Sequence, residues 1–286
     1  MLHSLIAVST RRDIKRWARR LLTEQELTPF SARSLLLSYL LGTHPPDVPA
    51  ARLVDVGELF GLRAGTVRTA LSRLTAAGDL EADDGRYRLA GRLLERQREL
   101  DRGQRSLASG WSGEWWTVLV TADARSVADR RRFRSAMEGA LLGELRPDTW
   151  MRPANTETPG EVVATFCESG VVATRGPLTV GDGAALARQL WDVDSIESTS
   201  TAIVDVLGPL GTALAATEVG SDERASLLPL TFEVSAVAVR HLRTEPQLPV
   251  DLADSSASQA LRTTYAEVTA LFRSALDEHL RHHAAP

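Results

Sequence analysis

Apolar residues recur at helical spacing through the first 80 residues. The periodicity predicts a helix over residues 10–28 and three shorter helices over 32–41, 51–60 and 65–77. Ser31 is a good N-cap for the second helix, and the proline-rich loop over 42–49 ends it. In the predicted helix over 65–77, the apolar residues Val67, Ala70, Leu71 and Leu74 fall at positions i, i+3, i+4 and i+7.

A hairpin pattern follows these helices. Polar and apolar residues alternate over 80–83 and 86–89, on either side of Asp84-Gly85, which is a strong two-residue turn signal. Three helices followed by a hairpin are typical of a winged helix-turn-helix. A pair of antiparallel helices with a β-appendage would give the same order.

The spacing of the apolar residues changes after a charged stretch over 91–113, which is predicted to be a helical connector. A strand over 115–121, a helix over 128–142, a short strand around Trp150 and a strand pair over 161–168 and 170–175 are predicted. This βαββ order indicates a small ferredoxin-like α+β domain. Further helices are predicted over 184–191, 195–207, 226–242 and 258–283.

The patterns together predict an α+β protein of five consecutive segments. They are a basic amphipathic N-terminal helix over 1–28, a winged helix-turn-helix domain over 29–90, a helical connector over 91–113, a ferredoxin-like central domain over 114–182 and a helical C-terminal domain over 183–286. The length of 286 residues suits two or three domains.

Composition excludes several classes of protein. Hydrophobic residues make up 43% of the chain and charged residues 24%, as in ordinary globular domains. Cys167 is the only cysteine, which excludes a disulfide framework, a CxxC zinc site and an iron–sulfur set. No apolar run approaches the roughly 18 residues of a membrane span. The apolar stretch over 2–8 precedes Arg11 and Arg12, the reverse of the order in a secretory signal, so we expect a cytoplasmic protein.

Charge is distributed unevenly. Residues 1–105 contain 18 Lys and Arg against 13 Asp and Glu, whereas the remainder contains 15 against 24. A basic segment on an acidic chain favours a local contact with a polyanion. For the basic helix over 10–28, three interpretations compete: packing on the body or a partner subunit, a DNA-backbone contact, or a membrane-surface helix. Packing is favoured, because Trp17 and Leu21 need cover.

The helix over 65–77 is the main candidate for recognition. With its apolar row inside, five polar residues face outward: Thr66, Arg68, Thr69, Ser72 and Arg73. Short hydroxyls and arginines near the N-terminal half of a helix suit the major groove, where arginine donates two hydrogen bonds to guanine. Arg33, Arg63 and Arg88 are candidate phosphate contacts.

The predicted hairpin carries a mixed charge. Arg86 and Arg88 could contact phosphates, but Asp83 and Asp84 at the tip would repel them. Either the hairpin stays off the DNA backbone, or its arginines pair with those aspartates.

Catalytic motifs are absent from the sequence. There is no GxSxG elbow, Walker A loop, HExxH or strand-linked GxGxxG, so we expect no enzyme activity, cofactor or metal site. Asp123 follows a strand and is where a metal-dependent nuclease could hold a cation, although a cap or loop role is far commoner. Cys167 is expected in the core. His241, with Arg240 and Arg243, is the candidate contact for an anionic effector.

Five blocks in chain order carry a more specific signal. They are SARSLLL at 31–37 with TVRTALSRL at 66–74 and Gly78, WSGEW at 111–115, WMRP at 150–153, LWDV at 190–193 and EPQLP at 245–249. Over about residues 31–250, the chain resembles the PaaX-like family of phenylacetic acid degradation repressors.

The resemblance implies a bacterial, homodimeric transcriptional repressor. It implies a winged helix N-terminal domain, a central ferredoxin-like (Cas2-like) domain with a structural role and a helical C-terminal domain. In the best-known members an aryl-CoA thioester relieves repression. The implied DNA-reading positions are Arg68, Thr69, Ser72 and Arg73.

The sequence therefore supports a dimeric, ligand-responsive DNA-binding regulator. Its expected partners are double-stranded operator DNA, a second copy of the chain and a small effector such as an acyl- or aryl-CoA thioester, with no membrane. Two alternatives stay open: a metal-dependent nuclease that uses Asp123, and a winged helix that contacts another protein.

Overall fold

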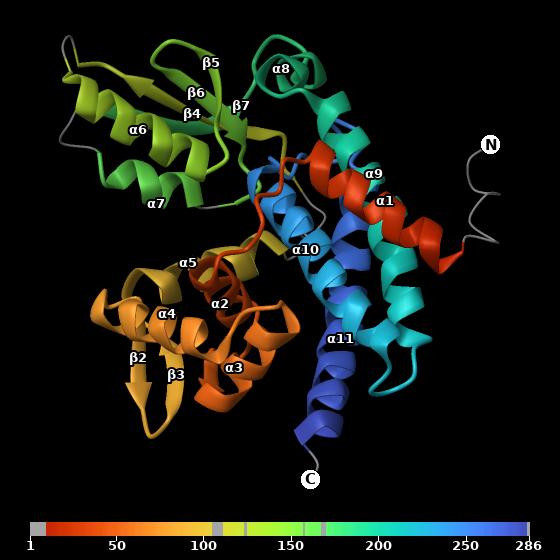
Figure 1. Ribbon diagram of the computed structural model, residues 1–286. Coiled ribbons are helices and arrows are strands. Elements are labelled where there is room, and N and C mark those ends of the chain that lie inside the picture. Colours follow the sequence, from red (N-terminus) through yellow and green to blue (C-terminus); the bar gives the residue numbers. More distant parts are fainter. Residues whose placement is uncertain (1–9, 105–110, 123–124, 157, 167–169, 285–286) are drawn as a thin grey trace. The chain divides into compact units, whose positions relative to one another are not determined.

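The computed structural model describes residues 10–104, 111–122, 125–156, 158–166 and 170–284 (Figure 1). Within these ranges the protein has eleven helices and two antiparallel sheets, so the predicted α+β class is confirmed. The chain forms two compact units. The first comprises Met1–Arg105, Ala202–Arg240 and Arg262–Pro286, and the second comprises Ser106–Thr201 and His241–Leu261.

The first unit begins with helices and a small sheet. Their bounds are α1 (Arg11–Glu24), α2 (Ala32–Leu41), β1 (Asp47–Pro49), α3 (Ala50–Leu59), α4 (Ala64–Ala76), β2 (Leu80–Asp83), β3 (Arg86–Leu89) and α5 (Gly91–Gln104). The predicted turn between β2 and β3 is present, with Asp84 and Gly85 at positive φ. Leucines and valines from α2, α3, α4 and both hairpin strands form one buried core.

Strand β1 corrects the loop predicted over residues 42–49. It pairs with β3 and gives a three-stranded sheet in the order β1-β3-β2. Three residues are too few for an alternating pattern to be visible, and the strand exists because β3 offers a free edge.

Helix α1 turns its apolar side into the first unit. Thr10 and Asp13 form a capping box at its start, and Ile14, Ala18 and Leu21 are buried. The cover expected for Leu21 is therefore present. Trp17 lies beside this row and stays 36% exposed, so the expectation that its side chain is covered was wrong.

Four phenylalanines join distant segments of the first unit. The Phe232 ring, on α10 (Asp222–Thr244), lies 5.4 Å from that of Phe30, 5.3 Å from Phe60 and 5.9 Å from Phe272 (centroid distances). Phe30 precedes α2, Phe60 ends α3, and Phe272 belongs to α11 (Ser256–Ala284). This cluster fixes α2 and α3 against α10 and α11.

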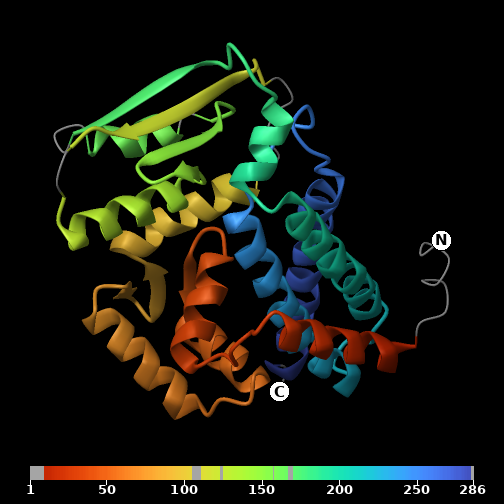
Figure 2. The ribbon, with the colours of Figure 1, turned by 90° about the horizontal axis from the view of Figure 1, so that it is seen from above.

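The second unit contains a four-stranded sheet. Its elements are β4 (Glu114–Val120), α6 (Val127–Gly139), β5 (Gly143–Arg146), β6 (Thr149–Pro153), α7 (Thr158–Ala164) and β7 (Val171–Pro177), and the strand order is β5-β6-β4-β7. Helices α6 and α7 cover one face of the sheet (Figures 1 and 2), through Phe133, Met137 and Val163. The opposite face packs against α8 (Gly183–Leu190) through Trp115 and Ala187.

One prediction in this unit was wrong. Residues 161–164 of the strand predicted over 161–168 belong to helix α7, because Pro159 favours a helix start and Val163 packs on the sheet. The strand predicted around Trp150 is present as β6, and the sequence pattern missed β5, which pairs with it.

The C-terminal helices are longer than predicted. α9 (Val193–Ala215) continues through Pro209, beyond the predicted end at residue 207, and α10 extends beyond the predicted range of 226–242 at both ends. Leu207 and Leu210, on either side of Pro209, are both fully buried, so packing holds the helix together. Among the described residues, no helix is long and apolar enough to cross a membrane.

A buried arginine connects two of the sequence blocks in the second unit. Arg152 on β6 is 2% exposed and donates hydrogen bonds to the carbonyl oxygens of Ala140 (2.8 Å) and Pro246 (3.3 Å). Burial lowers the pKa of Arg152 to about 10, although the charge of Glu245 acts in the opposite direction. The block over 150–153 is thereby tied to the block over 245–249.

Candidate nucleic-acid interface

Helix α4 is held by a tight turn and a close helix contact. Gly61, at φ +75°, turns the chain between α3 and α4. Gly57 on α3 lies so close to Val67 that a Cβ at position 57 would stand 2.4 Å from the Val67 Cγ2. The contact fixes how deeply α4 sits, and hence which side chains it presents to solvent.

The outward face of α4 has the residues that its periodicity predicted. Val67, Ala70, Leu71 and Leu74 are buried. The five polar candidates are exposed: Thr66, Arg68, Thr69, Ser72 and Arg73. The Thr69 hydroxyl donates a hydrogen bond to the Gly65 carbonyl at 2.8 Å.

A groove of about 730 Å³ runs between α2 and α4. It is lined by Ser31, Ala32, Arg33, Arg63, Gly65, Thr66, Thr69, Ala70, Arg73 and Leu74. The described lining has three arginines and no carboxylate. The N-caps of α2 and α4, Ser31 and Arg63, both belong to it. Arginines beside helix N-termini suit a row of phosphates.

The structure divides the predicted arginine contacts into two groups. Arg63, Arg68 and Arg73 form no ion pair within the part of the chain that the structure describes. The arginines of the second group are each paired with a carboxylate: Arg33 with Asp79, Arg86 with Asp47 and Arg88 with Glu81. Only the arginines of the first group can bind an external anion without first breaking an ion pair with a carboxylate of the protein.

The hairpin arginines are paired, but not with the tip aspartates that the sequence suggested. Arg88 donates to Glu81 at 2.8 Å, and this hydrogen bond raises the pKa of Arg88. Arg86 donates to both oxygens of Asp47, on β1. Sequence reasoning missed Asp47 because β1 itself was not predicted.

Asp79 is a buried carboxylate that sequence reasoning did not single out. It is 2% exposed and accepts hydrogen bonds from Arg33 (2.7 Å) and Arg92 (3.0 Å). Burial raises the pKa of Asp79, but the hydrogen bonds and charges of Arg92 and Arg33 outweigh it, so that pKa lies below its usual value. The carboxylate joins α2 to α5 beside the groove.

Comparisons with known proteins relate this region to a described family. The family model described as PaaX-like protein matches residues 31–93, which include α2, α3, α4 and the hairpin. The uncharacterized protein Rv0674 from Mycobacterium tuberculosis is 32% identical with a TM-score of 0.63, and the likeness covers 87% of this chain and 99% of that chain. The chain belongs to the PaaX-like family. A comparison with curated proteins gives no match.

PaaX-like proteins are regulators rather than enzymes. Membership therefore supports transcription regulation and DNA binding, in agreement with the exposed face of α4.

The three residues predicted to contact an effector in this PaaX-like protein have different surroundings. His241 Nε2 lies 2.9 Å from the hydroxyl of Ser200, which is buried and also contacts Ser258. Arg240, in the first unit, donates to the Gln25 carbonyl, and Arg243 is exposed. His241 therefore belongs to a polar network inside the second unit.

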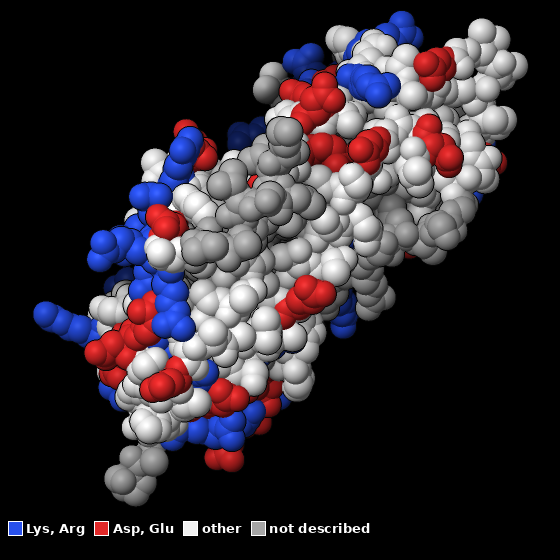
Figure 3. Space-filling model, turned by 90° about the vertical axis from the view of Figure 1, so that its right-hand side faces the viewer, with Lys and Arg blue, Asp and Glu red and all other residues white. Residues whose placement is uncertain are grey.

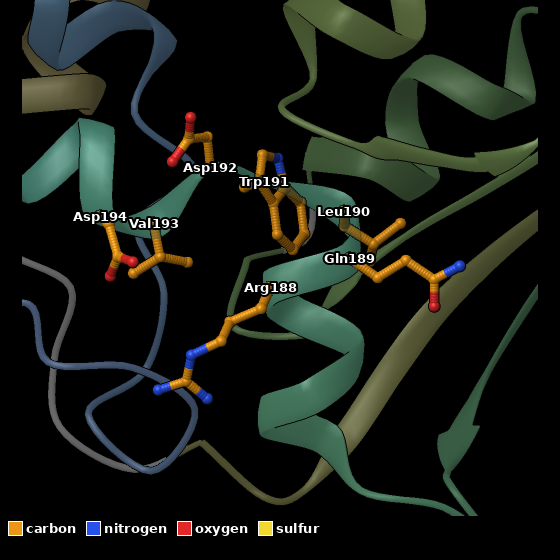
Figure 4. Close-up of a pocket in the computed structure, with 7 residues that line it drawn as sticks. All are labelled: Arg188, Gln189, Leu190, Trp191, Asp192, Val193 and Asp194. Carbon is orange, nitrogen blue, oxygen red and sulfur yellow. The ribbon is translucent and has the colours of Figure 1, made fainter.

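A shallow hollow lies at the turn between α8 and α9 (Figure 4). It is lined by residues 188–194, which include the LWDV block. In Figure 4 the side chains of Arg188, Trp191 and Asp194 border one open space, whereas Leu190 and Gln189 project to the other side. The PaaX-like protein thus presents an aromatic surface between charges of both signs.

Two candidates of the sequence lie outside the described residues, Asp123 and Cys167. Among the residues that are described, no set of three His, Cys, Asp or Glu side chains is placed to hold a metal ion. His282 and His283 continue helix α11.

Proposed function

We propose that this protein is a homodimeric transcriptional repressor that binds operator DNA through α4. The observation that carries the proposal is the outward row of hydroxyls on α4 with arginines that form no ion pair among the described residues, beside a groove lined by arginines and no described carboxylate. A protein that binds the phosphate backbone and reads base edges needs both kinds of group.

The surrounding elements support a winged helix-turn-helix over residues 29–90. α3 and α4 are joined by a short glycine turn, and the β2-β3 hairpin stands where a wing would follow the recognition helix. In the central segment over 114–182, the order βαββαβ and the sheet β5-β6-β4-β7 support a ferredoxin-like domain. The connector over 91–113 and a helical segment over 183–286 complete the proposed organisation.

We assign different tasks to the residues of the interface. Arg68, Thr69 and Ser72 lie on the outward face of α4 and would read bases in the major groove, together with Thr66. Arg63 and Arg73 line the groove and are free to hold phosphates. Arg33, Arg86 and Arg88 contribute only as far as their carboxylate partners release them.

Two copies related by a two-fold axis would place two α4 helices on half-sites of a pseudo-palindromic operator. A small effector, such as an acyl- or aryl-CoA thioester, would release the repressor, and His241 and Arg243 of the second unit are its candidate contacts. To do so it must bind the DNA-incompetent form more tightly than the competent form.

Footprinting of the purified protein on the DNA upstream of its own gene and neighbouring genes tests the proposal. We expect a discrete protected site with internal two-fold symmetry, and protection that weakens between about 50 and 200 mM salt. Absence of protection at both salt concentrations would contradict autoregulation through α4 and favour a winged helix that contacts a protein.

A further inference from the structure

Helix α1 presents a concentrated basic face that the proposed function does not use. Five of its cationic side chains line one open hollow of about 460 Å³ together with Glu223: Arg11, Arg12, Lys15, Arg16 and Arg19. Figure 3 shows the side of the molecule that carries α1, where a band of Lys and Arg follows one edge with Asp and Glu between them.

Two of these cations anchor α1 to other elements, and Arg16 pairs with Asp13 on the helix itself at 2.8 Å. Lys15 pairs with Glu223 at 3.0 Å and bonds to the Ser226 hydroxyl, and Arg11 donates to the Ala216 carbonyl. Arg12 and Arg19 are exposed and form no salt bridge within 4 Å among the described residues, although their charges act on two nearby carboxylates, Asp13 and Glu233. The helix is thus held rigidly against α10 while two arginines, seven residues apart on one face, point outward.

We propose that the basic face of α1 is a second DNA contact, which binds phosphates flanking the site occupied by α4. This inference rests on the proposed function and adds an interaction surface to it. Arg12 and Arg19 are separated by roughly 10 Å along the helix axis. That spacing lets both guanidinium groups contact the backbone of one strand, and guanidinium forks match phosphate oxygens.

The structure argues against a membrane as the partner of this face. A membrane-surface helix must insert an apolar side into the lipid. The apolar side of α1, with Ile14, Ala18 and Leu21, is already buried in the protein. Trp17 alone, at 36% exposure, is too little apolar surface to anchor it. An extended row of phosphates is the partner that needs only the exposed cations.

The test measures binding of the full-length protein to a fluorescein-labelled random-sequence duplex of about 30 bp by anisotropy, at several salt concentrations between about 50 and 200 mM. Three double variants are compared with the wild type: Arg12→Ala/Arg19→Ala on α1, Arg63→Ala/Arg73→Ala at α4, and Arg130→Ala/Arg131→Ala on α6. The last pair is also exposed and forms no ion pair within the described ranges, so it controls for net charge. A thermal melting curve of each variant checks that it is folded.

We expect the α1 variant to bind more weakly and to lower the slope of log K against log salt by about 2, one for each phosphate contact. The α6 variant should retain the wild-type slope. A wild-type slope in the α1 variant, with a reduced slope in the α4 variant, would overturn this inference and leave the proposed function standing. An equal loss in the α6 variant would also overturn it, and failure of the wild type to bind at any salt would overturn both.

Discussion

Arg33 donates a 2.7 Å hydrogen bond to the buried carboxylate of Asp79 while also lining the groove beside α4. The side chain of Arg33 is about half exposed, at 51%. One arginine therefore has a structural partner inside the protein and access to an anion outside. A phosphate in the groove would have to share Arg33 with Asp79, which makes Arg63 and Arg73 the stronger phosphate contacts.

Asp79→Asn should destabilise the first unit. The variant keeps the shape of the side chain but loses its charge and one of the two acceptor oxygens that Arg33 and Arg92 contact, and we expect the free energy of unfolding at pH 7 to fall by about 1–3 kcal/mol. Urea denaturation measures this. Asp83→Asn, at the exposed end of β2, is the matched control and should change little.

The ionisation of Asp79 also predicts how the stability of the fold depends on pH. The pKa of Asp79 is lower in the folded protein than its usual value, so its carboxylate stabilises the fold above the unfolded pKa of about 3.9. The contribution is lost as the pH falls through the folded pKa. The difference between wild type and Asp79→Asn should therefore shrink at about pH 3. If the free energy of unfolding differs between wild type and Asp79→Asn by the same amount at about pH 3 as at pH 7, the lowered pKa of Asp79 is contradicted.

Gly57→Ala should push α4 out of place. The added Cβ would stand 2.4 Å from Val67 Cγ2, which forces one helix to move. Such overpacking costs about 1–3 kcal/mol of stability. Val67→Ala removes the clashing methyl, so the double variant should recover part of the loss that Gly57→Ala causes. Additive losses in a double-mutant cycle would show that the close contact does not set the position of α4.

Glu81→Gln should strengthen binding to DNA. The substitution releases Arg88 from its 2.8 Å ion pair and removes a negative charge from the hairpin. Anisotropy on a random-sequence duplex at low salt is expected to show tighter binding and a slope steeper by about 1. Glu95→Gln frees Arg98 on α5 in the same way and is the control. Unchanged binding in Glu81→Gln would place the hairpin away from the DNA.

Local periodicity was sufficient for the elements that carry the proposed interface. The bounds of α2 were predicted to the residue, and those of α4 to within one, because the i, i+3, i+4, i+7 row of α4 faces a single core. The same row determined which side chains of α4 are exposed. Strand β1 could not be predicted, because it depends on pairing between residues 47–49 and 86–88, far apart in the sequence.

Of the two hairpin arginines, Arg88 has an ion-pair partner that the sequence is sufficient to predict. A two-residue turn at Asp84-Gly85 places Glu81 directly opposite Arg88, as the structure shows, so the sequence contained that ion pair. The carboxylate partners of Arg86 and Arg33, in contrast, could not be inferred from the sequence. Asp47 and Asp79 come near them only through the tertiary fold, and sequence spacing gives no sign of it.

The central claim is that α4 reads the operator. Its most direct test is the affinity of Arg68→Ala for the duplex that footprinting defines, with Arg96→Ala as the control, an exposed arginine on α5 that forms no ion pair in the described chain. We predict a loss of about 1–3 kcal/mol in Arg68→Ala, roughly 5- to 150-fold in affinity, with relaxed specificity at one base pair of each half-site. Arg96→Ala should bind as the wild type does. Equal, wild-type affinity in both variants would contradict the claim.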